Sequence, residues 1–128
     1  MRISPLIMAV VAAGCVSISL AAAQPMPAGS AARGEALYTS RCSACHSLDA
    51  NRIGPRHRGV VGRRAASLSD FNYSPALRRL DVTWDEANLD RWLTNPTAVA
   101  PGTAMGIRVP SAQERADIIA YLRANPAR

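Results

Sequence analysis

The chain has 128 residues, and its 15 basic residues, all of them Arg, outnumber 9 acidic ones to give a formal charge of +6. This length is enough for one domain. The arginines form no basic repeat with interleaved aromatic side chains, which argues against a nucleic-acid-binding protein. The charge instead favours attraction to an acidic protein partner or to anionic lipid.

The first 23 residues differ in composition from the rest of the chain. A single charge at Arg2 precedes a largely apolar run over residues 3–20, and residues 21–23, all Ala, form an A-x-A cleavage pattern. This arrangement predicts a secretory signal peptide. Two alternatives remain open. The apolar run is long enough to serve as an uncleaved membrane anchor, and residues 12–15 loosely resemble a lipoprotein processing site.

Residues 24–30 are rich in Pro and Ala and are expected to form a flexible leader. A helix is predicted over residues 31–41, with Ser30 or Gly29 as its N-cap. Gly34 inside this helix costs up to about 1 kcal/mol relative to Ala, and a close crossing with another helix would explain its presence. Everything from residue 31 to residue 128 is interpreted as one domain.

The five residues that follow this helix, 42–46, read Cys-Ser-Ala-Cys-His. The C-x-x-C-H spacing is typical of covalent attachment of a c-type haem. The thiols of Cys42 and Cys45 can add to the two haem vinyl groups, and the ring of His46 is then placed under the iron. A disulfide between the two cysteines is the alternative use of exported thiols, but the adjacent His favours one covalently bound haem c. Haem attachment together with export predicts a periplasmic protein.

Residues 47–82 show no sustained periodicity and are punctuated by Gly and Pro, as expected of a segment that surrounds a prosthetic group. A Thr-to-Glu capping box at residues 83–86 predicts a helix that ends near Thr94, before an Asn-Pro pair. A Ser-to-Glu capping box at residues 111–114 predicts the last helix. Together the three helices predict an all-α domain. The side chains expected to face inward are Leu89, Trp92 and Leu93 in the first of these two helices, and Ile118, Ile119, Tyr121 and Leu122 in the second.

A haem iron held by His46 needs a sixth ligand if the protein carries electrons, and a thioether sulfur stabilises the reduced iron. Two Met residues follow the signal segment. Met26 lies in the leader, where nothing would hold it on the iron. Met105 ends the sequence Pro-Gly-Thr-Ala-Met, residues 101–105, a rigid turn between two predicted helices. We therefore predict His46 and Met105 as the two iron ligands.

These motifs together resemble class I c-type cytochromes, that is, mitochondrial cytochrome c and its short soluble bacterial relatives. The resemblance covers nearly all of residues 34–122. Besides the motifs at 42–46 and 101–105, it rests on Gly54-Pro55, Gly59, Gly62-Arg63, Tyr73, Trp84, Leu89, Asn95-Pro96 and Tyr121-Leu122. It implies the all-α cytochrome c fold, in which three main helices and their loops surround a covalently attached haem in a monomer.

The resemblance also implies roles for single residues. The carbonyl oxygen of Pro55 would accept a hydrogen bond from His46 and make it a more basic ligand. Arg63, Tyr73 and Trp84 would hold a buried haem propionate, which needs a cation or hydrogen-bond donors. Gly34 and Tyr121 would meet where the first and last helices cross.

The sequence departs from the family pattern at several positions near the expected haem. His57 stands where an apolar haem contact is usual, and it is interpreted as a surface or hydrogen-bonded His rather than an iron ligand. Trp92 replaces a Tyr whose hydroxyl usually reaches the Met sulfur, and Leu77 replaces a common Asn. Thr103, in the turn of Met105, is still expected to contact the cofactor. Fewer polar groups around the iron should raise the reduction potential.

The implied function is single-electron transport in a respiratory chain, not catalysis. The expected partners are larger redox proteins with acidic docking surfaces, such as a cytochrome bc complex, a terminal oxidase or a periplasmic dehydrogenase. The arginines expected nearest the haem edge are Arg41, Arg52, Arg56 and Arg108. One alternative is a dedicated or membrane-anchored haem subunit of a single oxidoreductase complex. The other is a peroxidase-like or gas-binding protein in which Met105 leaves the iron.

Overall fold

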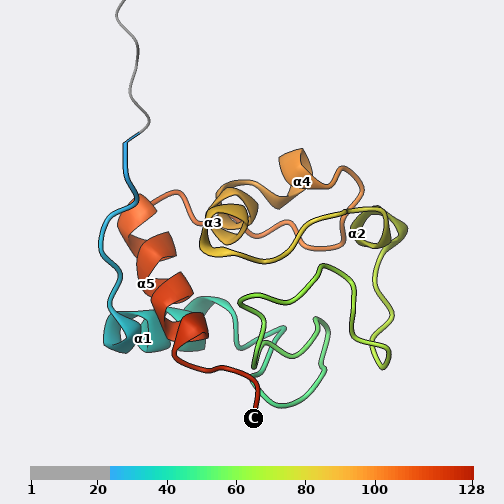
Figure 1. Cartoon of the computed structure of the whole chain (residues 1–128), viewed down its shortest axis with the longest axis horizontal. Coiled ribbons are helices and arrows are strands. Elements are labelled where there is room, and N and C mark those ends of the chain that lie inside the picture. Colours follow the sequence, from blue (N-terminus) through green and yellow to red (C-terminus); the bar gives the residue numbers. More distant parts are fainter. Residues whose placement is uncertain (1–23) are drawn as a thin grey trace, which may run out of the picture.

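The computed structural model describes residues 24–128, so the predicted signal segment and its two alternatives lie outside the described part of the chain. The helices of this part are α1 (Ala31–Arg41), α2 (Pro75–Arg78), α3 (Glu86–Thr94), α4 (Pro96–Val99) and α5 (Ala112–Arg123) (Figure 1). Within residues 24–128 the β pairing is limited to one isolated bridge between Arg64 and Thr83. The predicted all-α fold with three main helices is confirmed.

Helices α1 and α5 cross at a glycine. A Cβ on Gly34 would lie 1.9 Å from the carbonyl oxygen of Asp117 and 2.8 Å from the Cβ of Tyr121, so only glycine fits there. The buried carboxylate of Asp117 also holds the start of α1. It accepts hydrogen bonds from the backbone N–H of Ser30 at 2.7 Å and from two nitrogens of Arg33 at 2.8 Å each. The close crossing expected from Gly34 is therefore present, and the ion pair between exposed Arg33 and buried Asp117 reinforces it.

Helix α3 begins later than its predicted capping box implies. Asp85 is the N-cap, and its side chain accepts a hydrogen bond from the backbone N–H of Asn88 at 2.7 Å. Thr83 remains extended because it pairs with Arg64 in the isolated bridge. The predicted cap at Thr83 is therefore wrong, since backbone pairing keeps this residue out of the helix.

The two short helices, α2 and α4, are not predicted by the sequence analysis. Each begins with a side-chain cap followed by a proline: Ser74 precedes Pro75, and Asn95 precedes Pro96. Proline fits the first position of a helix because its missing N–H is not needed there. From the sequence, these prolines are interpreted only as residues that interrupt regular structure, which overlooks that they can also begin a helix.

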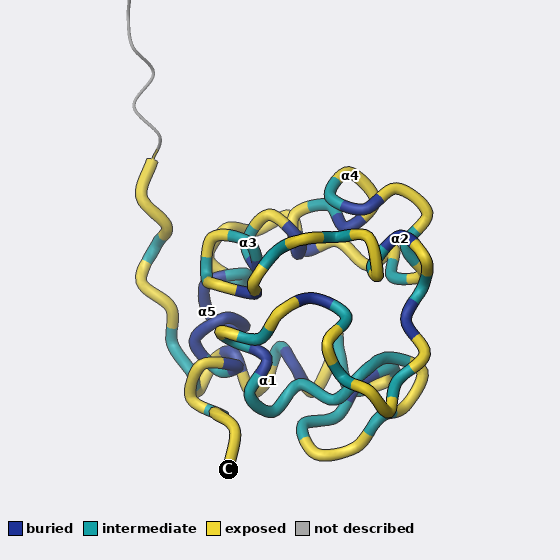
Figure 2. Tube along the Cα trace, turned by 45° about the vertical axis from the view of Figure 1, so that its right-hand side comes forward, coloured by how far each residue is buried: buried dark blue, intermediate teal, exposed yellow. Residues whose placement is uncertain are grey.

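The core lies where α1, α3 and α5 meet, and α5 is buried along most of its length (Figure 2). Helix α5 begins at the predicted cap, with the Ser111 hydroxyl accepting a hydrogen bond from the backbone N–H of Glu114 at 3.3 Å. Ile118 and Ile119 are each 1% exposed, whereas Tyr121, also predicted to face inward, is only partly buried. Over residues 24–128, no helix is both long and apolar enough to cross a bilayer.

Candidate haem site

The Cys-x-x-Cys-His motif forms a tight turn at the end of α1. Cys42 is the C-cap of this helix, and its carbonyl oxygen accepts hydrogen bonds from the backbone N–H groups of Cys45 at 3.1 Å and His46 at 2.9 Å. Both cysteines are free and partly exposed, so the alternative disulfide is not formed in this structure. Burial raises the pKa of the Cys42 thiol to about 11. The turn therefore holds two unoxidised sulfurs close to one imidazole.

The ring of His46 is oriented by its neighbours. Its Nδ1 lies 2.8 Å from the carbonyl oxygen of Pro55, and because a carbonyl can only accept, Nδ1 is the donor. Burial lowers the pKa of His46 despite this hydrogen bond, which favours the neutral ring. In that tautomer Nε2 carries the lone pair that a metal would bind. The backbone of Gly54 lies so close that a Cβ there would be 2.2 Å from Cε1 of His46.

His57 is packed directly against His46. The two rings stack with centroids 3.9 Å apart and planes inclined by 21°. Nδ1 of His57 is hydrogen-bonded to the hydroxyl of Tyr38 at 3.1 Å, and burial together with the nearby His46 and Arg63 lowers the pKa of His57 well below its usual value. His57 is thus a hydrogen-bonded residue, one of the two interpretations made from the sequence. The sequence carries no signal that would have named Tyr38 as its partner.

Arg63, Tyr73 and Trp84, the residues expected to hold a propionate, lie close together. The backbone N–H of Trp84 donates to the carbonyl oxygen of Arg63 at 2.8 Å. The half-buried guanidinium of Arg63 donates to the carbonyls of Arg56 at 2.8 Å and Arg58 at 3.4 Å, but within residues 24–128 it forms no ion pair with a carboxylate. Burial lowers the pKa of Arg63, and the phenol of Tyr73 is close enough to oppose this shift. A half-buried cation without an anionic partner fits a carboxylate group of a ligand.

Met105 lies in the segment that follows α4. Its backbone N–H donates to the hydroxyl of Thr103 at 3.3 Å, and its side chain packs partly buried against the core. Gly102 has a φ of 89°, a left-handed conformation that favours glycine. Met26, by contrast, is 39% exposed. Figure 1 shows this orange segment and the teal-to-green segment after α1 on opposite sides of the molecule.

The two other departures from the family pattern both lie in or beside the core. Trp92 is 7% exposed, and its ring lies 5.2 Å from that of Trp84 at an interplanar angle of 57°. Leu77 is partly buried against the same core residues. Leu77 therefore presents apolar surface where the family pattern has a polar side chain, and Trp92 presents a mostly apolar ring with a single N–H donor.

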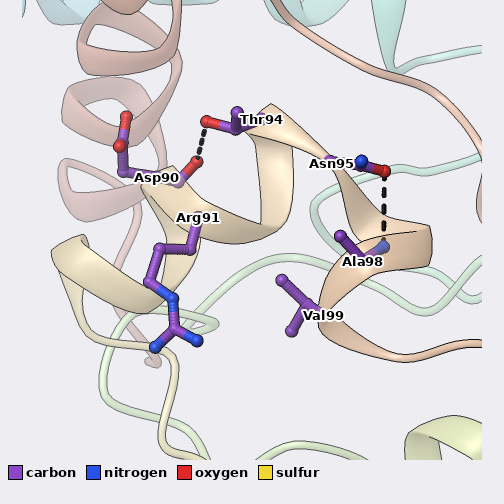
Figure 3. A pocket seen from close by; sticks show the side chains of 6 residues that line it. All are labelled: Asp90, Arg91, Thr94, Asn95, Ala98 and Val99. Carbon is purple, nitrogen blue, oxygen red and sulfur yellow. Dashed lines mark hydrogen bonds between the residues drawn. The ribbon is translucent and has the colours of Figure 1, made fainter.

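An open surface groove of about 340 Å³ lies between α3 and α4, away from these residues. It is lined by Asp90, Arg91, Thr94, Asn95, Ala98 and Val99 (Figure 3). Its polar groups already serve the helices: the Thr94 hydroxyl donates to the carbonyl of Asp90, and the Asn95 side chain accepts from the N–H of Ala98. No residue expected to hold the haem lines this groove, so it is not part of the candidate site.

Taken together, the donor set fits a covalent haem. Two free thiols stand beside an imidazole with a free Nε2, a thioether lies in a segment on the other side of the molecule, and a half-buried guanidinium can neutralise a carboxylate. The structure places Pro55 against His46, Thr103 against the backbone of Met105, and Trp92 against Trp84, so the predicted residues lie in three separate groups.

Comparison with known proteins gives matches over most of the chain. Residues 31–126 match the family described as Cytochrome c. The chain is 44% identical over 101 residues to cytochrome c2 of Rhodomicrobium vannielii, covering 74% of this chain and 78% of that protein. It is 40% identical over 100 residues to the cytochrome c-type cyt cy of Rhodobacter capsulatus, covering 77% of this chain and half of that protein.

A solved structure gives the same result for the fold. The chain resembles cytochrome cH from Methylobacterium extorquens with a TM-score of 0.72 and 39% identity, covering 75% of this chain and 99% of that one. The attachment motif, the helical fold and the sequence relatives all agree. The chain therefore belongs to the cytochrome c family, as a class I c-type cytochrome that binds haem c covalently and transfers electrons rather than catalysing a reaction.

Proposed function

We propose that this cytochrome is exported to the periplasm and shuttles single electrons between larger redox proteins, with its haem bound through Cys42 and Cys45 and its iron held by His46 and Met105. The observation that carries this proposal is the fixed tautomer of His46, whose Nδ1 donates to the carbonyl of Pro55 at 2.8 Å and leaves Nε2 for the iron. The bound haem supplies a one-electron Fe(III)/Fe(II) couple.

The residues of the chain adjust this couple from two sides. The hydrogen bond to Pro55 increases the basicity of His46, and the soft sulfur of Met105 favours the reduced iron. Arg63 would neutralise a propionate, and Tyr73 and Trp84 would help to bind it. If His46 and Met105 both held the iron, no coordination position would be left for a substrate, and a carrier would be favoured over the peroxidase-like or gas-binding alternative.

An exposed apolar residue lies beside each of the two proposed ligands, and these two positions are the candidate docking surface. Ile53, next to the glycine that contacts His46, is 80% exposed, and Ile107, two residues after Met105, is 56% exposed. Each has an exposed arginine beside it, Arg52 and Arg108. The other two arginines expected there already pair with carboxylates: Arg41 with Glu114 and Arg56 with Asp70. Arg52 and Arg108 are therefore the better candidates to attract an acidic redox partner.

The ligands are tested by exporting the full chain from a bacterium that attaches haem c. Intact mass should show one added haem and the loss of residues 1–23. The visible spectra of both oxidation states should be low-spin, with a sulfur-to-iron band in the ferric protein. Met105→Ala should abolish that band, whereas the control Met26→Ala should keep it.

Other outcomes of this experiment favour the alternatives. A high-spin spectrum in the resting native protein would support the peroxidase-like or gas-binding reading. A retained N-terminal segment that co-purifies with one enzyme would support a membrane-anchored subunit. An unchanged spectrum in Met105→Ala would exclude Met105 as the ligand.

The docking surface is tested by the rate of electron transfer to an oxidase or reductase with an acidic docking face. Arg52→Gln and Arg108→Gln should slow the reaction at low ionic strength, and the difference should fade as salt screens the attraction. Arg91→Gln is the matched control, because Arg91 lies at the groove between α3 and α4 (Figure 3). Equal slowing in all three variants would indicate a general charge effect and no defined surface.

A further inference from the structure

We propose that Tyr38 and His57 act as a pair of positioning residues for His46. The hydroxyl of Tyr38 fixes the His57 ring, and this ring in turn sets the plane of the His46 ring and the reduction potential of the iron. The inference rests on the proposed function, because it takes His46 as an iron ligand. It concerns the side chain of His57, which lies outside the attachment motif at residues 42–46.

The pair is built from three contacts. The hydroxyl of Tyr38 and Nδ1 of His57 are hydrogen-bonded at 3.1 Å, and the two rings meet edge-on with centroids 5.7 Å apart. His57 then stacks on His46 at 3.9 Å. Tyr38 is itself 5% exposed and lies in α1, so the helix that ends in the attachment turn also orients the ring beside the ligand.

The backbone of His57 is also tied to the residue after the ligand. Its N–H donates to the carbonyl of Ser47 at 2.9 Å, and its own carbonyl accepts from the N–H of Val60 at 2.9 Å. With its backbone and Nδ1 both held, the His57 ring cannot turn independently. Its face is therefore a fixed surface against which the His46 ring rests.

A fixed polar ring at this position has two consequences for the iron. The plane of an axial imidazole determines how its orbitals overlap with those of the iron, so limiting its rotation gives one electronic state. A polar neighbour also stabilises the more highly charged ferric site better than an alkyl side chain does. His57 should therefore lower the reduction potential and oppose the apolar environment contributed by Trp92 and Leu77.

The test compares Tyr38→Phe with Tyr121→Phe in the purified haem-loaded protein. Tyr121 packs on Tyr38 with ring centroids 5.2 Å apart, so both variants remove a hydroxyl from one aromatic cluster, and only the first touches His57. The readouts are the reduction potential and the proton NMR shifts of the haem methyl groups in the ferric state, which report the plane of the axial ring. Tyr38→Phe should change both readouts, and Tyr121→Phe should leave both unchanged.

His57→Leu completes a double-mutant cycle. Alone, His57→Leu should raise the reduction potential. At a fixed solution potential, the ratio of oxidised to reduced protein should shift several-fold towards the reduced protein. If the two residues act as a unit, Tyr38→Phe should have no further effect in the His57→Leu background. A Tyr38→Phe effect that persists at full size there, or an equal effect of Tyr121→Phe, overturns the proposal.

The spectra separate this inference from the proposed function. A variant that keeps the low-spin spectrum with its sulfur-to-iron band retains both ligands, so unchanged potential and methyl shifts in Tyr38→Phe refute the pair alone. A native protein without such a spectrum refutes the ligand assignment instead. Because Tyr38→Phe preserves the shape of the side chain in a buried site, it is the variant on which the result depends.

Discussion

Replacing Gly54 by Ala should displace the ring of His46. A Cβ at this position would lie 2.2 Å from Cε1 and 2.6 Å from each ring nitrogen of His46. Ordinary contact begins at 3.4 Å, so the ring must retreat by the difference, about 1.2 Å. The glycine itself has little freedom to move, because its N–H donates to the carbonyl of Cys45 at 2.8 Å and its carbonyl accepts from the N–H of Arg52 at 2.9 Å.

A shift of this size is incompatible with the 2.8 Å hydrogen bond between His46 and Pro55. Overpacking of a buried site typically costs about 1–3 kcal/mol, and the lost hydrogen bond adds about 1 kcal/mol. We therefore expect the free energy of unfolding to fall by about 2–4 kcal/mol in Gly54→Ala. The reduction potential should rise, because a ligand without its hydrogen bond is less basic and stabilises ferric iron less well.

The measurement is denaturant unfolding of the ferric holoprotein, combined with a redox titration. Gly106→Ala is the matched control: Gly106 is next to Met105, its φ is not positive, and a Cβ there meets no described atom within 4 Å. This control should stay within about 0.5 kcal/mol of the native protein. If Gly54→Ala matched Gly106→Ala in both stability and potential, the contact between the glycine and the ring could not be as the structure has it.

Two further changes test the helix crossing and the sixth ligand. The hydrogen bonds from Arg33 lower the pKa of Asp117 from 3.8 to about 2. The ionised Asp117 therefore contributes its full stability above the pKa of the unfolded state, and this stability is lost as the pH falls through the pKa of the folded state. Denaturant unfolding from pH 5 to pH 2 should thus show a steeper loss for the native protein than for Asp117→Asn, and equal slopes would contradict the assignment. At high pH, the chain has no Lys to displace Met105, Arg stays protonated, and His57 lies on the His46 side. Hydroxide or the α-amino group should therefore replace Met105, and an amine-ligated spectrum from an N-terminally blocked sample would contradict this.

The sequence predicts those elements whose signals are local. The side chain of Ser30 caps α1 and that of Ser111 caps α5, because a cap depends on residues only three positions apart. The cap of α3 could not be found this way. Thr83 and Asp85 both have the chemistry of a cap, and the choice between them depends on the pairing of Thr83 with Arg64, a residue distant in sequence.

In the candidate site, too, some residues could be predicted from local sequence signals and other contacts could not. The attachment motif names Cys42, Cys45 and His46 because the chemistry fixes their spacing, and the resemblance supplies Pro55, whose carbonyl the structure places 2.8 Å from His46. The packing of Gly54 on the ring, and the bond between Tyr38 and His57, join residues whose meeting depends on how the chain folds back. No periodicity or spacing encodes such a contact, and only the three-dimensional structure reveals it.

The two proposed ligands are held by different kinds of structure, and this difference determines which of them can leave. His46 is fixed by the turn from Cys42, by the hydrogen bond to Pro55 and by contacts with Gly54 and His57. Met105 lies outside any helix, and the hydrogen bond of its backbone N–H is a long one at 3.3 Å. Local opening costs least where the fewest contacts must break. An incoming ligand should therefore reach the iron from the Met105 side, while the His46 side keeps the haem bound and the electronic state of the iron constant.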